Sequence, residues 1–152
     1  MIPPDTLSNK GRTAEILLVE DNPGDILLTK RALAKSRMLN NITSARSGDE
    51  AMAILSHDSA RPSAKTPDLI LLDLNLPKIS GLDVLKNVKS HEKLRRIPVI
   101  IFSSSQAEAD VVRSYDFHAN SYIMKPVSLE AYAQVVASIE QFWFSLVVLP
   151  NE

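Results

Sequence analysis

The chain has 152 residues, 45% of them hydrophobic and 23% charged, which fits one soluble globular domain that buries a core without covalent staples. A net charge of −1 with no basic block argues against a nucleic-acid partner, and the absence of cysteine excludes disulfides, thiolate catalysis and Cys-based metal sites. No apolar run has the length of a signal-peptide core or a membrane span, so we expect a cytoplasmic protein with no membrane partner.

Strand and helix patterns alternate five times along the chain. Residues 1–13 lack periodicity and predict a flexible N-terminal arm, which precedes one domain over 14–144. Short runs rich in Ile, Leu and Val are typical of parallel strands that are buried on both faces. The predicted strands cover 16–20, 42–46, 69–73, 99–103 and 121–125, the second being weaker and nearer the sheet edge. The alternation predicts an α/β domain built of βα repeats.

Capping residues predict where the helices begin. Asn is a good N-cap, Pro suits the first helical position, and a Ser followed three residues later by Glu forms a capping box. The predicted starts are Asn22 with Pro23, the capping box of Ser47 and Glu50, Gly81, the capping box of Ser105 and Glu108, and Ser128.

Polar residues close four of the apolar runs. Glu20 and Asp21 follow the first strand, Asp73 follows the third, Ser103 ends the fourth, and Lys125 ends the fifth. In open α/β sheets, reactive groups gather beyond the carboxyl ends of the strands, so we expect these side chains to share one crevice. Clustered carboxylates repel one another unless a hard cation such as Mg²⁺ lies among them. A carboxylate held beside Mg²⁺, a lysine and a hydroxyl is a plausible acceptor for a phosphoryl group.

Four motifs in this order resemble the receiver domain of response regulators in two-component systems. They are LLVEDN (17–22), LILLDLNLPKISG (69–81), IPVIIFSSS (97–105) and YIMKP (122–126), with 52 residues from Asp21 to Asp73 and 52 more to Lys125. The resemblance covers most of the chain. It implies a flavodoxin-like (βα)5 fold with a doubly wound parallel sheet in the strand order 2-1-3-4-5, followed by an extended C-terminal helix and tail.

The resemblance implies a role in phosphorylation or in the switch for five residues. Asp73 would accept a phosphoryl group from the phosphohistidine of a sensor histidine kinase, while Lys125 and Ser103 would contact the phosphoryl oxygens. Pro126 fits a cis Lys–Pro peptide, which the family uses to aim the lysine, while the sequence by itself leaves the isomer open. Tyr122 would change rotamer when the Ser103 hydroxyl moves, so that phosphorylation switches the neighbouring surface.

The resemblance also implies a Mg²⁺ site. Asp21 and Asp73 would ligate the metal ion directly, Glu20 would act through water, and the main-chain carbonyl of Asn75 would supply a further ligand. Glu20 departs from the commoner Asp-Asp pair but keeps its charge, so we expect altered metal affinity with the same chemistry.

The residues before the fifth strand and the C-terminus are similar to those of the small receivers that partner cyanobacterial phytochromes. His118, Ala119 and Asn120 replace the usual Gly-Ala pair, and His tolerates a positive φ better than most residues. We therefore expect a phytochrome as the kinase partner. Only 27 residues follow Lys125, so the output is expected through docking to a downstream protein or phosphorelay and not through DNA binding.

The last predicted helix has more apolar residues than one core needs. A stripe of Leu129, Tyr132, Val136, Ile139 and Trp143 recurs at helical spacing, and further apolar residues flank and follow it. Leftover aromatics usually mark an interface, so we predict a homodimer, with residues 145–152 as a C-terminal extension that contributes to it. The predicted interface residues are Val135, Phe142, Trp143, Phe144, Leu146, Val147 and Leu149. The alternative is that this tail folds back over its own domain.

Three other functions compete with the receiver. A hydrolase of the haloacid dehalogenase type needs an acid where Asn75 stands, and a nucleotide-binding flavodoxin-like domain needs a Gly-rich loop after the first strand. A pseudo-receiver that acts as a dimeric docking module without phosphorylation stays open as the alternative. A receiver turns over no external product, so the chain is not expected to be an enzyme.

Overall fold

The computed structural model describes residues 13–35, 39–56 and 66–143 of the chain. Most of the predicted N-terminal arm and all of the predicted C-terminal extension therefore lie outside the described residues, as do Phe144, Leu146, Val147 and Leu149 of the predicted dimer interface. None of the helices within the described ranges has the length and apolar character that crossing a membrane requires.

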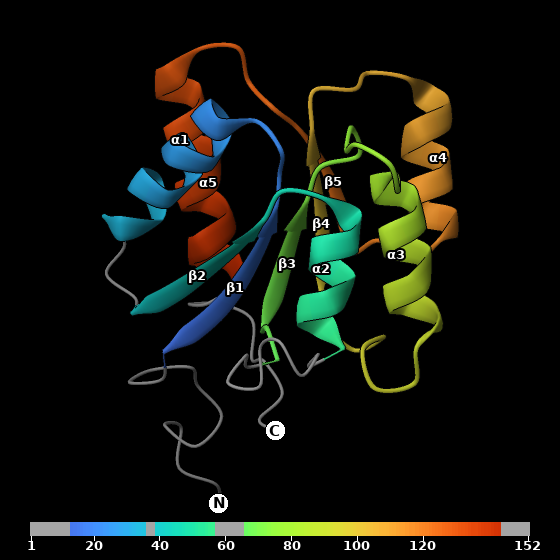
Figure 1. The fold of residues 1–152 in the computed structure, drawn as a ribbon. Coiled ribbons are helices and arrows are strands. Elements are labelled where there is room, and N and C mark those ends of the chain that lie inside the picture. Colours follow the sequence, from blue (N-terminus) through green and yellow to red (C-terminus); the bar gives the residue numbers. More distant parts are fainter. Residues whose placement is uncertain (1–12, 36–38, 57–65, 144–152) are drawn as a thin grey trace, which may run out of the picture.

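Five parallel strands form one sheet in the order β2-β1-β3-β4-β5, which confirms the predicted fold class (Figure 1). The strands are β1 (Ala14–Val19), β2 (Asn40–Ala45), β3 (Leu69–Leu72), β4 (Val99–Ser103) and β5 (Ser121–Met124). Four of them end one residue earlier than the apolar runs predicted. The polar residue that closes each of those runs, among them Glu20, Asp73 and Lys125, therefore lies just beyond the sheet.

The helices are α1 (Pro23–Ala34), α2 (Gly48–Leu55), α3 (Gly81–Ser90), α4 (Glu108–Asp116) and α5 (Leu129–Gln141). Three predicted caps are confirmed, because the side chains of Asn22, Ser47 and Ser128 accept hydrogen bonds from backbone N–H groups in the first turns of α1, α2 and α5. These bonds satisfy donors that the first turn of a helix leaves without an intrahelical partner.

The predicted capping box of Ser105 and Glu108 is wrong. The residue before α4 is Ala107, and it makes no side-chain cap hydrogen bond. Ser105 has another partner, because its hydroxyl donates to Asp110 at 2.6 Å. The sequence pattern was right for a cap, but the carboxylate of Asp110 in the first turn of α4 binds the serine instead.

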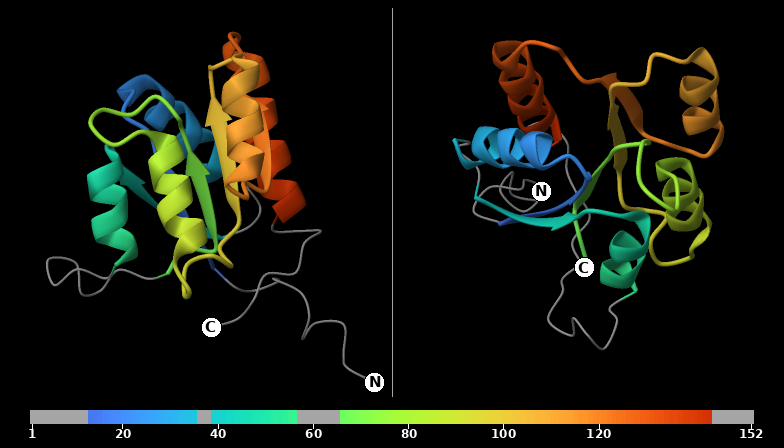
Figure 2. Two further views of the ribbon diagram at one scale, coloured as in Figure 1. Left: turned by 90° about the vertical axis from the view of Figure 1, so that its right-hand side faces the viewer. Right: turned by 45° about the horizontal axis from the view of Figure 1, so that its top comes forward.

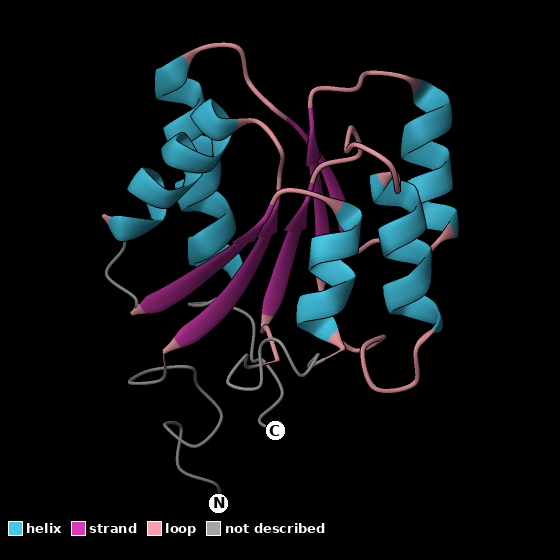
Figure 3. Cartoon of the chain, in the orientation of Figure 1, coloured by secondary structure: helices cyan, strands magenta, loops and turns pink. Residues whose placement is uncertain are grey.

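The helices cover the sheet on both faces. Figure 2 shows α1 and α5 on one side of the sheet and α2, α3 and α4 on the other. Alternate strand residues follow this division: Leu17 and Ile70 pack in the core with α2 and α3, while Leu18 and Leu71 pack in the core with α1 and α5. All strands point the same way, so the loops that leave them gather at one edge of the sheet (Figure 3). The loops therefore rest on a sheet that is packed against core residues on both faces.

Helix α5 packs through part of the predicted stripe. Tyr132, Val136 and Ile139 are buried, and Trp143 packs against the same core cluster. Leu129 was expected in this stripe but is 68% exposed. The prediction fails because Leu129 is the first residue of the helix, ahead of the turns that pack against the sheet.

Candidate functional site

The predicted site residues converge at the carboxyl edge of the sheet. Glu20 follows β1, Asp73 follows β3, Ser103 ends β4 and Lys125 follows β5. Backbone hydrogen bonds extend the ladder past the strands: the N–H of Asp73 donates to Val19 O at 3.0 Å, and the N–H of Lys125 donates to Ser103 O at 2.9 Å. These residues are therefore held as rigidly as the strands that carry them.

The ammonium of Lys125 lies at the centre of this edge. It forms ion pairs with Glu20, with Asp25 at 2.8 Å and with Asp73 at 3.0 Å. The side chains of Lys125, Glu20 and Asp73 are 8%, 3% and 6% exposed. One buried cation thus faces three carboxylates, and the cluster carries a net negative charge.

Asp25 is a member of this cluster that the sequence analysis missed. It lies in the first turn of α1, and its side chain is 25% exposed. The available signal was its place in that turn, four residues after Asp21, which brings it back over the end of β1. Acidic residues are common in first turns for their interaction with the helix dipole, so the pattern alone did not single it out.

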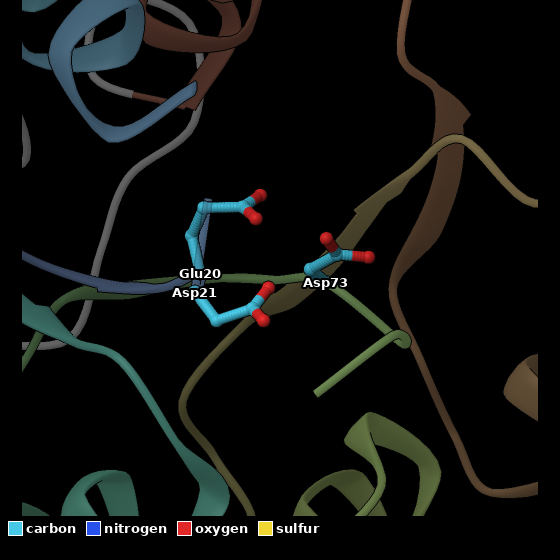
Figure 4. A group of neighbouring side chains, drawn as sticks. All are labelled: Glu20, Asp21 and Asp73. Atoms are coloured by element: carbon cyan, nitrogen blue, oxygen red, sulfur yellow. The ribbon is translucent and has the colours of Figure 1, made fainter. Parts of the chain in front are cut away.

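Glu20, Asp21 and Asp73 have carboxylate oxygens that all lie within 4.8 Å of one another. Figure 4 shows the side chains of Glu20 and Asp21, just after β1, extending toward the side where Asp73 stands after β3. Hard divalent cations take such oxygen ligands, so the donor set fits Mg²⁺. The other predicted ligand, the carbonyl of Asn75, belongs to an exposed residue whose N–H donates to Asp73 Oδ1 at 3.1 Å.

Burial and the neighbouring charges together set the pKa values of Glu20 and Lys125. Burial raises the pKa of Glu20 to about 7, the hydrogen bond from Lys125 opposes this rise, and the charge of Asp73 adds to it. Burial by itself lowers the pKa of Lys125, but hydrogen bonds to Asp25 and Glu20 and the charges of Asp73 and Glu20 outweigh it and raise this pKa. The lysine stays charged, while the carboxylates still favour a further cation.

The loop from β3 to α3 closes tightly over the base of Asp73. The N–H of Gly81 donates to Leu74 O at 3.0 Å. A Cβ on Gly81 would lie 2.2 Å from Asp73 O and 2.6 Å from the Cα of Leu74. Real Cβ atoms do not approach backbone this closely, so only glycine lets this loop close and α3 begin beside the aspartate.

Ser103 and Tyr122 lie beside the carboxylate cluster without joining it. The Ser103 hydroxyl is buried and accepts a hydrogen bond from the N–H of Ser105 at 3.3 Å, and it makes none to Asp73 in the described part of the chain. The Tyr122 hydroxyl donates to the Ser105 carbonyl at 2.9 Å, and the Tyr122 N–H donates to the Tyr115 hydroxyl at 3.2 Å. Tyr122 therefore ties β5 to the loop that precedes α4.

Two backbone predictions have different outcomes. Among the described residues there is no cis peptide bond, so the Lys125–Pro126 bond, whose isomer the sequence left open, is trans and not the cis form that the resemblance suggested. An X–Pro bond prefers trans by about 0.5–1 kcal/mol. His118 has φ 70°, which confirms that histidine occupies the positive-φ position before β5.

The described part of the predicted dimer surface is only partly free. Val135 and Trp143 are partly buried and pack against the core under α5, while Phe142 is 51% exposed. The rings of Phe142 and Trp143 meet edge to face, with their centroids 5.6 Å apart. A groove of about 530 Å³ runs beside them, lined by β5 and α5 residues that include Ile123 and Ile139. The core thus covers more of this surface than its composition suggested.

Comparisons with known proteins agree with this geometry. The response regulator receiver domain family matches residues 16–137. Response regulator Rcp1 of Synechocystis is 41% identical over 135 residues, which are 89% of this chain and 92% of Rcp1. The crystal structure of the phosphorylated cyanobacterial phytochrome response regulator RcpA has 47% sequence identity and a TM-score of 0.89, covering 91% of this chain and 99% of RcpA. The structure of Mn²⁺-bound Rcp1 has 40% identity and a TM-score of 0.87 over 91% of this chain and 99% of that one.

The family match covers most of the chain, and the fold, the strand order and the relatives all lead to one assignment. The motifs that predicted it are those that carry the carboxylate cluster and Lys125. This chain belongs to the response regulator receiver domain family of two-component signalling, and phytochrome response regulators are among its relatives.

Proposed function

We propose that this receiver accepts a phosphoryl group on Asp73 from a sensor histidine kinase. The observation that carries the proposal is the place of the Asp73 carboxylate, which lies within the three-carboxylate group and 3.0 Å from the Lys125 ammonium. One oxygen of Asp73 accepts from the Asn75 N–H and the other from Lys125, so the carboxylate has a fixed orientation.

In the proposed reaction, a carboxylate oxygen of Asp73 attacks the phosphorus of a phosphohistidine. An O–P bond forms as the P–N bond breaks, and the imidazole takes the electron pair and is protonated from solvent. Lys125 stabilises negative charge on the phosphoryl oxygens, and the hydroxyl of Ser103 donates to one of them after a small movement of its loop. The protein product is an aspartyl phosphate, and no external substrate is turned over.

A divalent cation completes the proposed site. Glu20, Asp21, Asp73 and the Asn75 carbonyl would hold Mg²⁺, which when bound neutralises charge on the transferring phosphoryl group. The support is the donor set itself, together with the Mn²⁺-bound structure of the relative Rcp1.

The test is intact mass after incubation with acetyl phosphate, with and without Mg²⁺, on wild type and Asp73→Asn. A single phosphoryl adduct that requires both Mg²⁺ and Asp73 is the expected result. Asp49→Asn is a matched control, because Asp49 is an exposed carboxylate in the first turn of α2. Well-folded protein that gains no adduct would overturn the proposal and support a dimeric docking module that works without phosphorylation.

The proposed location is the cytoplasm, where ATP-dependent kinases act. The proposed kinase partner is a phytochrome. The support is the likeness to the phytochrome response regulator RcpA over nearly the whole of that chain. Phosphotransfer from a purified phytochrome kinase is expected to be much faster than from a kinase of an unrelated system, measured with radiolabelled kinase.

Phosphorylation is proposed to act on a downstream protein through the surface around α4 and β5. Tyr122 holds the loop before α4 through Ser105, so movement of Ser103 toward a phosphoryl group would release that loop and let the ring of Tyr122 turn. Val112 and Tyr115 on α4 and Met124 on β5 are exposed and offer apolar contacts to a partner.

A homodimer is proposed on the α5 side, supported by the exposed ring of Phe142 and the apolar groove beside it. Phe142→Glu is expected to convert the dimer to a monomer in sedimentation equilibrium. Leu27→Glu is the control, because Leu27 on α1 has a similar exposure of 49%. A wild type that sediments as a monomer would contradict this part of the proposal.

A further inference from the structure

Asp25 differs from the other two carboxylates that contact Lys125. Glu20 and Asp73 both belong to the group whose oxygens lie close enough to share a metal ion, and Asp25 does not. Asp25 reaches the ammonium from the first turn of α1, at 2.8 Å. The lysine is therefore held by two carboxylates of the group that could share a metal ion and by one carboxylate outside that group.

The backbone of Asp25 is held at both of its polar groups. Its N–H donates to the Asn22 side chain at 3.2 Å, within the cap that starts α1. Its carbonyl accepts from the Tyr132 hydroxyl of α5 at 3.5 Å, and that hydroxyl also bonds to Thr29 at 2.9 Å in the buried contact between α1 and α5. The Asp25 carboxylate therefore projects from a rigid part of the fold toward Lys125.

The difference matters once a divalent cation occupies the carboxylate group. Oxygens of Glu20 and Asp73 that bind the cation have less charge to offer the ammonium, whereas Asp25 keeps its full charge. Lysine has a long, flexible stem and loses side-chain entropy when it is fixed in one position. Without a remaining anchor, the ammonium would spend less time beside Asp73.

We propose that Asp25 is the positioning residue for Lys125, anchoring its ammonium beside Asp73 while the metal-binding carboxylates are engaged by the cation. This inference rests on the proposed function of Asp73 as the phosphoryl acceptor. Asp25 touches neither the phosphoryl donor nor the reacting oxygen, and acts only through the lysine.

The first test compares rates of phosphorylation by acetyl phosphate in saturating Mg²⁺, followed by intact mass, for Asp25→Ala, Asp25→Asn and the control Asp49→Ala. Misplacing a reacting group slows transfer, and Asp25→Ala is expected to cost about tenfold. Asn keeps an acceptor oxygen, and a neutral hydrogen bond has about half the strength of a charge-assisted one, so Asp25→Asn is expected to cost about threefold. Asp49→Ala is expected to match wild type.

The second test follows the ammonium itself by NMR of protein labelled with ¹⁵N-lysine. A hydrogen-bonded NH₃⁺ exchanges slowly with water and gives a visible cross-peak, which is assigned to Lys125 by its loss in Lys125→Arg. With Mg²⁺ present, the cross-peak is expected to persist in wild type and to vanish in Asp25→Ala. In EDTA it is expected in both, because Glu20 and Asp73 then still hold the lysine.

Each outcome decides the inference. Equal or faster phosphorylation of Asp25→Ala would overturn it, since Asp25 would then compete for the lysine or contribute nothing. Equal slowing of Asp25→Ala and Asp25→Asn would also overturn it. The acceptor oxygen that Asn keeps would then make no difference, so Asp25 would act through its negative charge alone and not as a hydrogen-bonded anchor. If wild type is never phosphorylated, the proposed function fails, while the NMR comparison still tests the anchor. Thermal melting confirms folding, and Asp25→Asn preserves the test if the alanine variant unfolds.

Discussion

Two lysines at opposite ends of the sheet each bind three oxygens. Lys125, at the carboxyl edge, contacts three carboxylates. Lys89, in the last turn of α3, lies at the amino edge, where its ammonium donates to Arg95 O at 3.0 Å, Ile97 O at 2.7 Å and Asn120 Oδ1 at 3.3 Å. A lysine ammonium is thus paired with charged carboxylates at the carboxyl edge of the sheet and with neutral carbonyl and amide oxygens at the amino edge.

The partners set opposite electrostatic behaviour. Burial lowers the pKa of Lys89, because carbonyl and amide dipoles do not make up for lost hydration. At Lys125 burial also lowers the pKa, but the ion pairs outweigh it and the net shift is upward. A cation among excess carboxylates would suit the proposed phosphoryl site, while the cation among carbonyls links the segment before β4 to the residue before β5.

The largest expected effect is on the rate of phosphorylation, which should depend on Lys125 and not on Lys89. Lys125→Met is expected to slow phosphorylation by acetyl phosphate by about 10²–10³-fold, because a preorganised charge aimed at the phosphoryl oxygens is lost. The measurement is the time course of the phosphoryl adduct by intact mass in Mg²⁺. Lys89→Met is the matched control, with a rate equal to wild type. A Lys125→Met rate within about threefold of wild type would make the two lysines equivalent and break the comparison.

A middle-sized effect concerns stability at the amino edge. Lys89→Met is expected to lower the free energy of unfolding by about 1–3 kcal/mol, because the partly buried carbonyl of Ile97 and the exposed carbonyl of Arg95 lose their donor. Urea unfolding measures this change. An unchanged urea midpoint would mean that water replaces the ammonium at these carbonyls and that Lys89 does not stabilise the fold.

The smallest effect is a difference in alkaline pH dependence, measured by urea unfolding in EDTA. The raised pKa of Lys125 means that its contribution to stability is complete below the ordinary value of 10.5 and is lost as pH rises through the folded-state pKa. The lowered pKa of Lys89 means that the unfolded chain binds more protons below 10.5, so stability rises with pH toward that value.

These opposite signs are visible as differences between wild type and each methionine variant. The stability advantage of wild type over Lys125→Met is expected to shrink above pH 10.5, and its advantage over Lys89→Met to grow up to that pH. For Lys89→Met, subtraction removes the titration of the tyrosines. For Lys125→Met, the charge of Lys125 also lowers the pKa of Tyr132, so that comparison is made with Tyr132→Phe in both proteins. Slopes of the same sign would show that the two environments do not differ as the contacts indicate.

The carboxyl edge was largely predictable from local sequence. Parallel strands end at one edge, so an apolar run that closes on Glu20, Asp73 or Lys125 places that residue there whatever the details of packing. The caps at Asn22, Ser47 and Ser128 were predictable for the same reason, since a cap binds donors within its own turn. The roles of these residues in phosphorylation stay predictions until the adduct is measured.

The amino edge and the contacts between elements were not predictable in this way. The role of Lys89 depends on Asn120, which lies 31 residues further along the chain. Asp25 joins the cluster only because α1 leaves β1 at an angle that returns its first turn to Lys125, 100 residues away. The cap predicted at Ser105 failed because a carboxylate in the first turn of α4 competed for its hydroxyl.

The sequence by itself determined the order of the elements, the family and the residue types at the carboxyl edge, because strand period, caps and motif spacing are local properties. Only the tertiary structure decided which groups meet. Lys125 contacts three carboxylates, and Asp25 is the one that lies outside the group of Glu20, Asp21 and Asp73. Helix α5 buries Tyr132 and leaves Leu129 exposed. Charge interactions act across space and not along the chain, so helix packing had to set these distances.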